Sequence, residues 1–234
     1  MKSFFYQNPN GYCYNSDTIF LYGFIKEHFK LKGNVLDVGT GVGVLAILLA
    51  REFRANFDAI EKQKIMYEYA LKNQAINKIA INFINEDFLQ YYTEKRYDFI
   101  ISNPPFYKVD RHQSKNEIIN IARYEHHLPL EQFIQKVSQL LKPRGYFIFC
   151  YDAQHSSEVI ALLQEKKLQV ELLQFLHPKI NKNASLSLIA ARKGSKANTK
   201  VLAPFVVFDE NNNYTSKAVN ILKQANTHSI KAVL

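Results

Sequence analysis

Cysteine is scarce in this sequence, and long apolar runs are missing. Its two cysteines, Cys13 and Cys150, lie far apart and match no zinc-binding or redox spacing. We therefore expect two reduced thiols of the kind found in the cytosol. No apolar stretch is long enough to cross a bilayer, and the apolar run at the N-terminus is too short for a secretion signal. These absences favour a cytoplasmic protein with no membrane partner.

Negative charge is also in short supply. The chain has 30 Lys and Arg residues against 21 Asp and Glu residues, a formal net charge of +9. Such an excess favours polyanionic partners such as nucleic acid, although a solvated surface explains it equally well. Basic residues are more closely spaced in the C-terminal part of the chain, at Lys179, Lys182, Arg192, Lys193, Lys196 and Lys200.

Short runs of β-branched and aromatic residues alternate with longer segments of helical spacing. This alternation is typical of an α/β fold built from βα units. The predicted strands are Asn34–Val38, Asn56–Ile60, Ile81–Asn85, Tyr97–Ser102, Tyr146–Tyr151, Gln169–Leu176 and Leu186–Arg192. The predicted helices are Val42–Phe53, Gln63–Asn77, Leu130–Leu141 and Ala153–Lys166.

The spacing within two of these helices predicts which faces are buried. Val42–Phe53 is apolar on most faces, so we expect it inside the protein. In Gln63–Asn77, a face that carries Ile65, Tyr69, Lys72 and Ile76 is expected to pack inward.

The two ends of the chain extend this core. Residues 1–33 hold a turn at Asn8-Pro9-Asn10-Gly11 and a helix that Ser16 or Asp17 could cap. After Gly194 we expect a strand, a turn and a helix, at Phe205–Phe208, Asp209–Asn213 and from about Thr215. Neither segment is long enough for a domain. We therefore predict a single domain, 1–234, with a core at 34–193 and extensions at 1–33 and 194–234.

A glycine-rich turn follows the first core strand. Gly39, Gly41 and Gly43 let the backbone bend sharply and approach a ligand closely. In the dinucleotide-binding pattern the third glycine stands one residue later, where this chain has Val44. That difference weakens a dinucleotide assignment, and a purely structural turn remains an alternative.

Acidic residues mark the ends of three successive predicted strands. Asp37 precedes the glycine turn, Glu61 follows the second strand, and Asp87 follows the third. Ligands of open α/β sheets bind along this edge, where a carboxylate can accept hydrogen bonds from both hydroxyls of a ribose. We therefore expect Glu61 to bind a ribose, and Asp87 with Phe88 to bind a base. Asp37 is expected near an ammonium group.

The fourth predicted strand runs into Asn103-Pro104-Pro105-Phe106 at the same edge. An amino group on an aromatic base is a poor nucleophile, because its lone pair is delocalised into the ring. The Asn103 side-chain oxygen and the Pro104 carbonyl can each accept one N–H of such an amine and direct its lone pair toward a methyl donor. The two prolines stiffen the loop, and Phe106 offers a ring on which the base stacks.

Together these residues resemble the class I S-adenosylmethionine-dependent methyltransferases that methylate amino groups through an Asn-Pro-Pro-aromatic motif. The flanking segments resemble the tRNA1(Val) (adenine(37)-N6)-methyltransferase family, at Asn8-Pro9, Gly11, Asn15–Thr18, Ala122–Glu125 and Tyr214-Thr215. The resemblance spans nearly the whole chain. Many relatives carry tyrosine in place of Phe106, and either ring stacks.

The resemblance implies a Rossmann-like, seven-stranded, mostly parallel sheet with one antiparallel strand. It also implies S-adenosylmethionine as cofactor, tRNA as the RNA partner and adenine 37 as the target. The implied cofactor-binding set is Asp17, Asp37, Gly39, Thr40, Gly41, Gly43, Glu61, Asp87, Phe88 and Asn103. Asp17 would help to close the pocket, although a plain helix cap is an alternative. No obligate protein partner is implied.

Three other functions stay open. Guanine-N2 methyltransferases of ribosomal RNA and protein glutamine methyltransferases share the motif, but they usually carry a further domain for which this chain has no room. A non-catalytic RNA-binding module is the third. If RNA binds, we expect the contacts at Lys193, Lys196, Lys200, Lys217, Lys108, Arg111 and Arg123. His112, His126 and His127 lack the spacing of a catalytic metal site, so we predict no metal.

Overall fold

The computed structural model describes residues 2–9, 13–105 and 128–233, and most of its described strands join one large sheet. The order is β10-β7-β8-β6-β5-β2-β3-β4, with β9 also pairing with β7. Along this sheet only β8 runs antiparallel to its neighbours β6 and β7. The strands are β2 (Asn34–Val38), β3 (Asn56–Glu61), β4 (Asn82–Asn85), β5 (Tyr97–Ser102), β6 (Leu141–Asp152), β7 (Leu168–His177), β8 (Leu186–Lys193), β9 (Lys200–Val201) and β10 (Phe205–Val206).

All seven predicted core strands are confirmed, as is the single antiparallel strand. The sheet is nevertheless wider than the seven strands expected, because β9 and β10 extend it beside β7. Strand β6 begins at Leu141, five residues before its predicted start. Of the residues before Tyr146, Leu141 pairs with Tyr97 of β5, and the register shifts between this pair and the pair of Phe99 with Tyr146.

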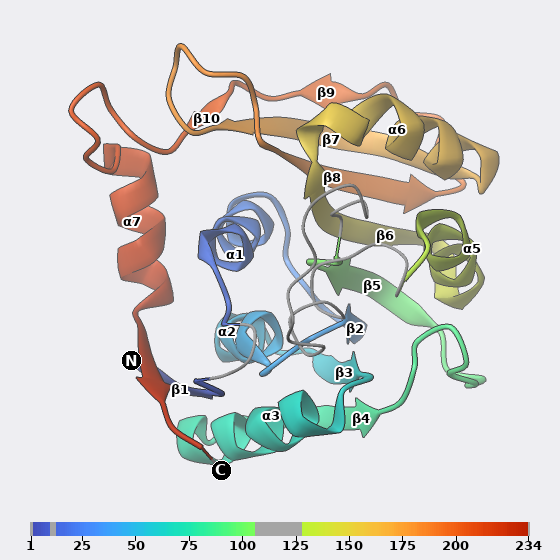
Figure 1. Cartoon of the computed structure of the whole chain (residues 1–234). Coiled ribbons are helices and arrows are strands. Elements are labelled where there is room, and N and C mark those ends of the chain that lie inside the picture. The colour runs from blue at the N-terminus through green and yellow to red at the C-terminus, as the bar shows by residue number, and fades with distance from the viewer. Residues whose placement is uncertain (1, 10–12, 106–127, 234) are drawn as a thin grey trace.

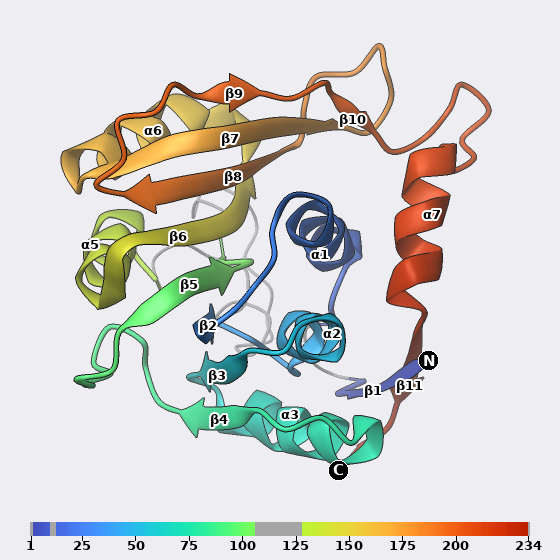
Figure 2. The same cartoon turned by 180° about the vertical axis from the view of Figure 1, so that it is seen from behind.

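Helices cover both faces of the sheet. On one face lie α1 (Ser16–His28), α2 (Val44–Glu52) and α3 (Lys64–Asn77), and on the other lie α5 (Leu130–Leu140) and α6 (Ser156–Glu165), which follows the short helix η2 (Ala153–His155) (Figure 1). Helix α7 (Ser216–Ala225) packs outside α1 (Figure 2). As predicted, α2 is buried from Val44 to Leu49. None of the described helices is both long and apolar enough to span a bilayer.

The predicted cap of α1 is wrong. Asn15, rather than Ser16 or Asp17, is the N-cap, and its side-chain oxygen accepts a hydrogen bond from the Asp17 backbone N–H. Asn15 has the extended backbone that this position requires. The other two residues already belong to the first turn.

The predicted inward face of α3 is only partly correct. Tyr69 is buried, but Ile65 and Ile76 are 36% and 40% exposed. Asn73 and Asn77 are buried instead. Their side-chain amides pair with the backbone of Tyr6 and Phe4 on β1 (Ser3–Gln7).

Strand β1 also pairs in parallel with β11 (Thr227–Lys231) in a separate two-stranded sheet. This pairing brings segments from the two ends of the chain together beside α3 (Figure 1). The Asn73 side chain, which holds β1, donates a further hydrogen bond to the Val42 carbonyl within the glycine-rich turn. The N-terminal strand is thus attached directly to the turn at the edge of the large sheet.

Candidate active site

The parallel register brings the carboxyl ends of β2, β3, β4 and β5 to one edge. Val38 of β2 pairs with Ile60 of β3 and with Ser102 of β5, and Glu61 pairs with Asn85 of β4. A cavity of about 990 Å³, its open mouth included, lies at this edge. Its walls include Asp37, Gly39, Thr40, Gly41, Glu61, Asp87, Phe88, Asn103 and Pro105. Most of the predicted site residues therefore share one cavity.

The glycine turn forms one wall of the cavity. Gly39, Gly41 and Gly43 all have positive φ, between 57° and 85°, a conformation that side chains disfavour. A Cβ on Gly43 would approach the Phe83 ring to 2.9 Å, whereas a Cβ on Gly39 would meet nothing within 4 Å. Gly43 is thus needed for packing against β4, and it does not line the cavity itself.

Glu61 fastens this turn from the neighbouring strand. One carboxylate oxygen accepts a hydrogen bond from the Gly41 N–H at 2.9 Å, and the other accepts from the Gln63 N–H at 2.8 Å. Burial raises the pKa of Glu61, and these backbone donors act in the opposite direction. The Lys62 N–H is a third backbone donor to this carboxylate. Since a carboxylate has about four acceptor sites, the side chain can still accept a hydrogen bond from a ligand in the cavity.

Asp37 is the most deeply buried acid of the cavity, with 1% exposure. The Thr40 hydroxyl donates to its carboxylate at 2.6 Å. Burial raises the pKa of Asp37 to about 7, although the hydrogen bond from Thr40 opposes the shift. A carboxyl in this state readily becomes an anion when a cation approaches.

Asp87 and Phe88 form another part of the wall. The Lys62 ammonium group forms an ion pair with Asp87 at 2.7 Å, and the second carboxylate oxygen accepts from the Leu89 N–H at 2.9 Å. Phe88 is 5% exposed and packs edge-to-face against Phe133 of α5. This wall therefore combines a polar acceptor with a fixed apolar ring.

Asn103 follows the last residue of β5 and lies at the junction of cavity and sheet. Its side-chain nitrogen donates to the Thr18 hydroxyl at 3.0 Å, and its oxygen accepts from the Cys150 thiol at 2.9 Å. Pro105 lines the cavity, whereas Pro104 is buried outside its walls. Phe106, the predicted stacking ring, lies outside the described residues, as do the flanking residues 122–125 and Gly11.

Asp17 is not among the residues that line the cavity. Its carboxylate accepts a hydrogen bond from the Asn15 side chain at 2.7 Å. Its neighbour Thr18 lines the cavity instead, together with Tyr14. Other lining residues that the sequence did not single out are Val38, Val42, Val44, Leu45, Ile60, Lys62, Gln63, Met66, Glu86 and Leu128.

Lys193, one of the predicted RNA contacts, is engaged within the protein. Its ammonium group donates to the backbone carbonyls of Ser138 and Leu141 at the C-terminal end of α5. Burial lowers the pKa of Lys193. A cation is favourable at this end of a helix, where carbonyl groups have no helical partner. Lys193 therefore has a structural role, while Lys196 and Lys200 are exposed.

We expect Lys193→Ala to lower the free energy of unfolding by about 1–2 kcal/mol, because two backbone carbonyls lose a charged donor. Urea unfolding measures the difference. Lys196→Ala, at an exposed position, is the matched control and should leave the midpoint unchanged. Equal midpoints for the two variants would contradict the structural role of Lys193.

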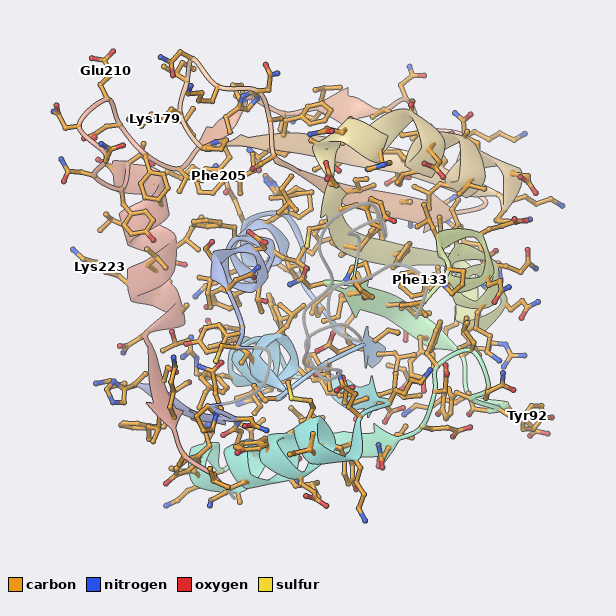
Figure 3. All side chains as sticks on the ribbon, viewed as in Figure 1. Tyr92, Phe133, Lys179, Phe205, Glu210 and Lys223 are labelled. Carbon is orange, nitrogen blue, oxygen red and sulfur yellow. The ribbon has the colours of Figure 1, made fainter. Side chains whose placement is uncertain are left out.

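Other basic residues of the C-terminal half are also engaged within the protein. Lys179 lies beside the loop that carries Glu210 (Figure 3), and its ammonium group donates to the Glu210 backbone carbonyl at 3.3 Å. Lys217 forms an ion pair with Glu27 at 3.1 Å. Lys108, Arg111 and Arg123 lie outside the described residues. Lys179 and Lys217 thus use their charge in contacts within the protein.

No cluster of three or more His, Cys, Asp or Glu side chains that could hold a metal ion occurs in the described part of the chain. His112, His126 and His127 lie outside that part. The polar side chains that line the cavity are the carboxylates of Asp37, Glu61, Glu86 and Asp87, the hydroxyls of Tyr14, Thr18 and Thr40, the carboxamides of Gln63 and Asn103, and the ammonium group of Lys62.

The chain is similar in sequence and in fold to known methyltransferases. A curated tRNA1(Val) (adenine(37)-N6)-methyltransferase from Porphyromonas gingivalis strain W83 is 37% identical over 118 residues, 47% of this chain and 46% of the relative. The chain thus matches about half the length of this relative. A predicted O-methyltransferase from Agrobacterium tumefaciens has a TM-score of 0.70 at 17% identity, over 92% of this chain and 99% of that one.

A second solved structure is the T. thermophilus 16S rRNA N2 G1207 methyltransferase in complex with AdoMet and guanosine. It has a TM-score of 0.56 at 22% identity, over 77% of this chain and 44% of that one. The two solved structures show a shared class I methyltransferase fold. Residues 15–174, more than half of the chain, match the family model of the methyltransferase small domain. The chain is therefore a member of the methyltransferase small domain family.

Proposed function

We propose that this protein transfers a methyl group from S-adenosylmethionine to the exocyclic N6 of an adenine in RNA, with adenine 37 of a tRNA as the substrate. One observation carries the proposal: Asn103 lines the same cavity as the glycine turn and the carboxylates of Asp37 and Glu61. The name of the P. gingivalis relative supports the choice of tRNA and of the N6 atom.

The residues of the cavity fit the cofactor. Glu61 offers its carboxylate as an acceptor to the ribose, and Asp87 with Phe88 offers an acceptor and an apolar ring to the adenine. Asp37 would hold the ammonium end of the cofactor, and the turn at Gly39 and Gly41 would allow its close approach to the backbone. When bound, S-adenosylmethionine supplies an electrophilic methyl group on a sulfonium centre. We assign no cofactor contact to Asp17, because Tyr14 and Thr18 line the cavity in its place.

Asn103 positions the amine that is methylated. Its carboxamide oxygen accepts one N–H of the target amine. The Pro104 carbonyl stays the predicted acceptor for the other N–H, although Pro104 is buried and is not one of the residues that line the cavity. The amine lone pair is then directed into the cavity. These acceptors are held in place before the substrate arrives, which lowers the barrier because no reorganisation is needed. No strong general base is required, since the methylated ammonium group is acidic enough to lose its proton afterwards.

Incubation with labelled S-adenosylmethionine and separate pools of tRNA, rRNA, DNA and protein tests the proposal. We expect label in the tRNA pool, and N6-methyladenosine by mass spectrometry after digestion to nucleosides. N2-methylguanosine in rRNA would instead identify a guanine methyltransferase, and label on glutamine a protein methyltransferase. Binding of RNA without any transfer would identify a non-catalytic module.

The raised pKa of Asp37 predicts that cofactor binding depends on pH. The ionised carboxylate binds an ammonium group better than the neutral acid does. Affinity for S-adenosylmethionine should therefore rise about tenfold or more as the pH increases from about 5.5 to about 7.5. Isothermal titration calorimetry measures this rise. Asp37→Asn cannot ionise and should flatten the profile; an equally steep rise in that variant would exclude Asp37 as the titrating group.

The same carboxyl predicts how stability changes without the cofactor. The pKa of Asp37 is about 7 in the folded protein and close to its ordinary value of 3.8 in the unfolded chain. Between these values the folded protein binds a proton that the unfolded chain has released, so stability must fall as the pH rises through this range. Asp37→Asn should remove this part of the decline in urea unfolding.

A further inference from the structure

Three side chains from separate elements meet at the end of β5. Cys150 of β6 and Thr18 of α1 contact opposite ends of the Asn103 carboxamide, at 2.9 Å to its oxygen and 3.0 Å to its nitrogen. Cys150 is 0% exposed and Thr18 is 7% exposed. Thr18 lines the cavity, whereas Cys150 is not one of its lining residues. The hydrogen bond to Asn103 is therefore the direct link between Cys150 and the cavity.

The direction of the Asn103 carboxamide decides whether it can hold an amine. With the oxygen toward the target, the side chain accepts an N–H; after a half-turn it would present its own N–H groups to another donor. The oxygen has two lone pairs. A hydrogen bond from Cys150 therefore leaves one lone pair for the substrate.

The Cys150 thiol is suited to hold this direction. Burial raises the pKa of Cys150 well above its usual range, so the group stays a neutral thiol with a proton to donate. In the reversed amide, an N–H would face the sulfur, which is a weak acceptor. The Thr18 hydroxyl accepts from the side-chain nitrogen. The thiol contact therefore favours the orientation that catalysis needs, while the Thr18 hydroxyl can pair with either end of the amide and holds the side chain in place.

We infer that Cys150 is a positioning residue, and that with Thr18 it fixes the Asn103 carboxamide with its oxygen ready to accept the N–H of the target amine. The inference rests on the proposed methyl transfer to an amine. Cys150 thereby has a function, whereas the spacing of the two cysteines indicated only a structural thiol.

Substitutions at position 150 separate hydrogen bonding from packing. Cys150→Ala removes the donor and should lower kcat about threefold to tenfold, as expected for one lost hydrogen bond, with KM for RNA and affinity for S-adenosylmethionine nearly unchanged. Cys150→Ser restores a donor and should recover most of the lost kcat. Cys150→Val fills the space without a donor and should not recover it. Recovery by valine but not by serine would overturn the inference.

A matched control addresses general loosening of the core. Ile148 is also 0% exposed and lies two residues earlier on the same strand, in the same core cluster. Ile148→Val removes one methyl group from the same face without touching Asn103. It should lower the thermal midpoint by an amount comparable to Cys150→Ala while kcat stays unchanged. An equal loss of kcat in both variants would show that Cys150 acts only through packing.

A second readout does not depend on methyl transfer. In protein labelled with ¹⁵N-asparagine, the side-chain amide signals of Asn103 are identified by their loss in Asn103→Ala. We expect one sharp pair in the wild type and in Cys150→Ser, and shifted or doubled signals in Cys150→Ala. Unchanged signals in Cys150→Ala would refute the positioning role. If the wild type transfers no methyl group but these signals respond as expected, the proposed function fails while the hydrogen bond stands.

Discussion

Replacement of Asn103 by alanine should reduce turnover by about 10²–10³, the loss that follows removal of one preorganised polar group from an active site. The side chain stands where β5 ends, between Thr18 and Cys150, and its oxygen is the acceptor that we assign to the target amine. Affinity for S-adenosylmethionine should change little, because Asp37, Glu61 and the glycine turn remain. Single-turnover transfer of label to tRNA and calorimetry of cofactor binding measure the two quantities separately.

Asn56→Ala provides the control for this experiment. Asn56 is an exposed asparagine at the opposite end of β3, away from the cavity, and its removal should leave turnover at the wild-type value. If Asn103→Ala transfers methyl groups at the normal rate, the acceptor lies elsewhere. If it loses cofactor affinity in proportion to turnover, Asn103 acts in cofactor binding and not in chemistry.

The second large effect is expected at Glu61. Glu61→Ala should weaken affinity for S-adenosylmethionine by about a hundredfold or more, since each hydrogen bond to a charged acceptor contributes about 1.5–3 kcal/mol. Two losses combine here. The ribose hydroxyls lose their acceptor, and the N–H groups of Gly41 and Gln63 lose the carboxylate that holds the turn in place.

Glu61→Gln distinguishes charge from shape. The amide has nearly the same volume, but its NH₂ group would face one of the two backbone N–H donors, so we expect a loss close to that of alanine. Glu68→Ala removes an exposed carboxylate from α3 and should leave cofactor affinity unchanged. Wild-type affinity in Glu61→Ala would remove this residue from the ribose site.

Most of the sheet could be predicted from the sequence, because each core strand is a short apolar run bounded by turn or acidic residues. Strands β1 and β11 could not be predicted in this way. These two strands pair with each other although they lie at opposite ends of the chain, so no local sequence pattern predicts the pairing of Ser3 with Thr227. Asn73 and Asn77 could not be assigned to the buried face of α3 either, because polar residues of a helix are usually expected to face outward. Here they are buried because they form hydrogen bonds with the backbone of β1. The prediction that the chain forms one domain stays a prediction.

The part of the candidate site that lies at the ends of strands could be predicted from the sequence. Asp37, Glu61 and Asn103 come together because parallel register places their strand ends side by side. The contacts of Thr18 and Cys150 with Asn103 depend on how α1 and β6 pack around β5, and spacing along the chain carries no such information. The Asn15–Thr18 segment did indicate that the start of α1 lies near the site. The residue predicted from it was Asp17, whereas the residue that lines the cavity is Thr18.

Lys193 shows that a lysine in a basic stretch of sequence can stabilise the fold. A lysine near a chain segment rich in lysine is expected to face water, yet this one caps the end of α5. Its role depends on β8 running past that helix end, which only the fold determines.

Methylation of two otherwise identical tRNA transcripts, one with adenosine and one with guanosine at position 37, tests the central claim most directly. With labelled S-adenosylmethionine, we expect one methyl group per molecule of the adenosine transcript, recovered as N6-methyladenosine, and none on the guanosine transcript. Equal labelling of both transcripts, or label recovered on any atom other than N6 of adenine, would contradict the account.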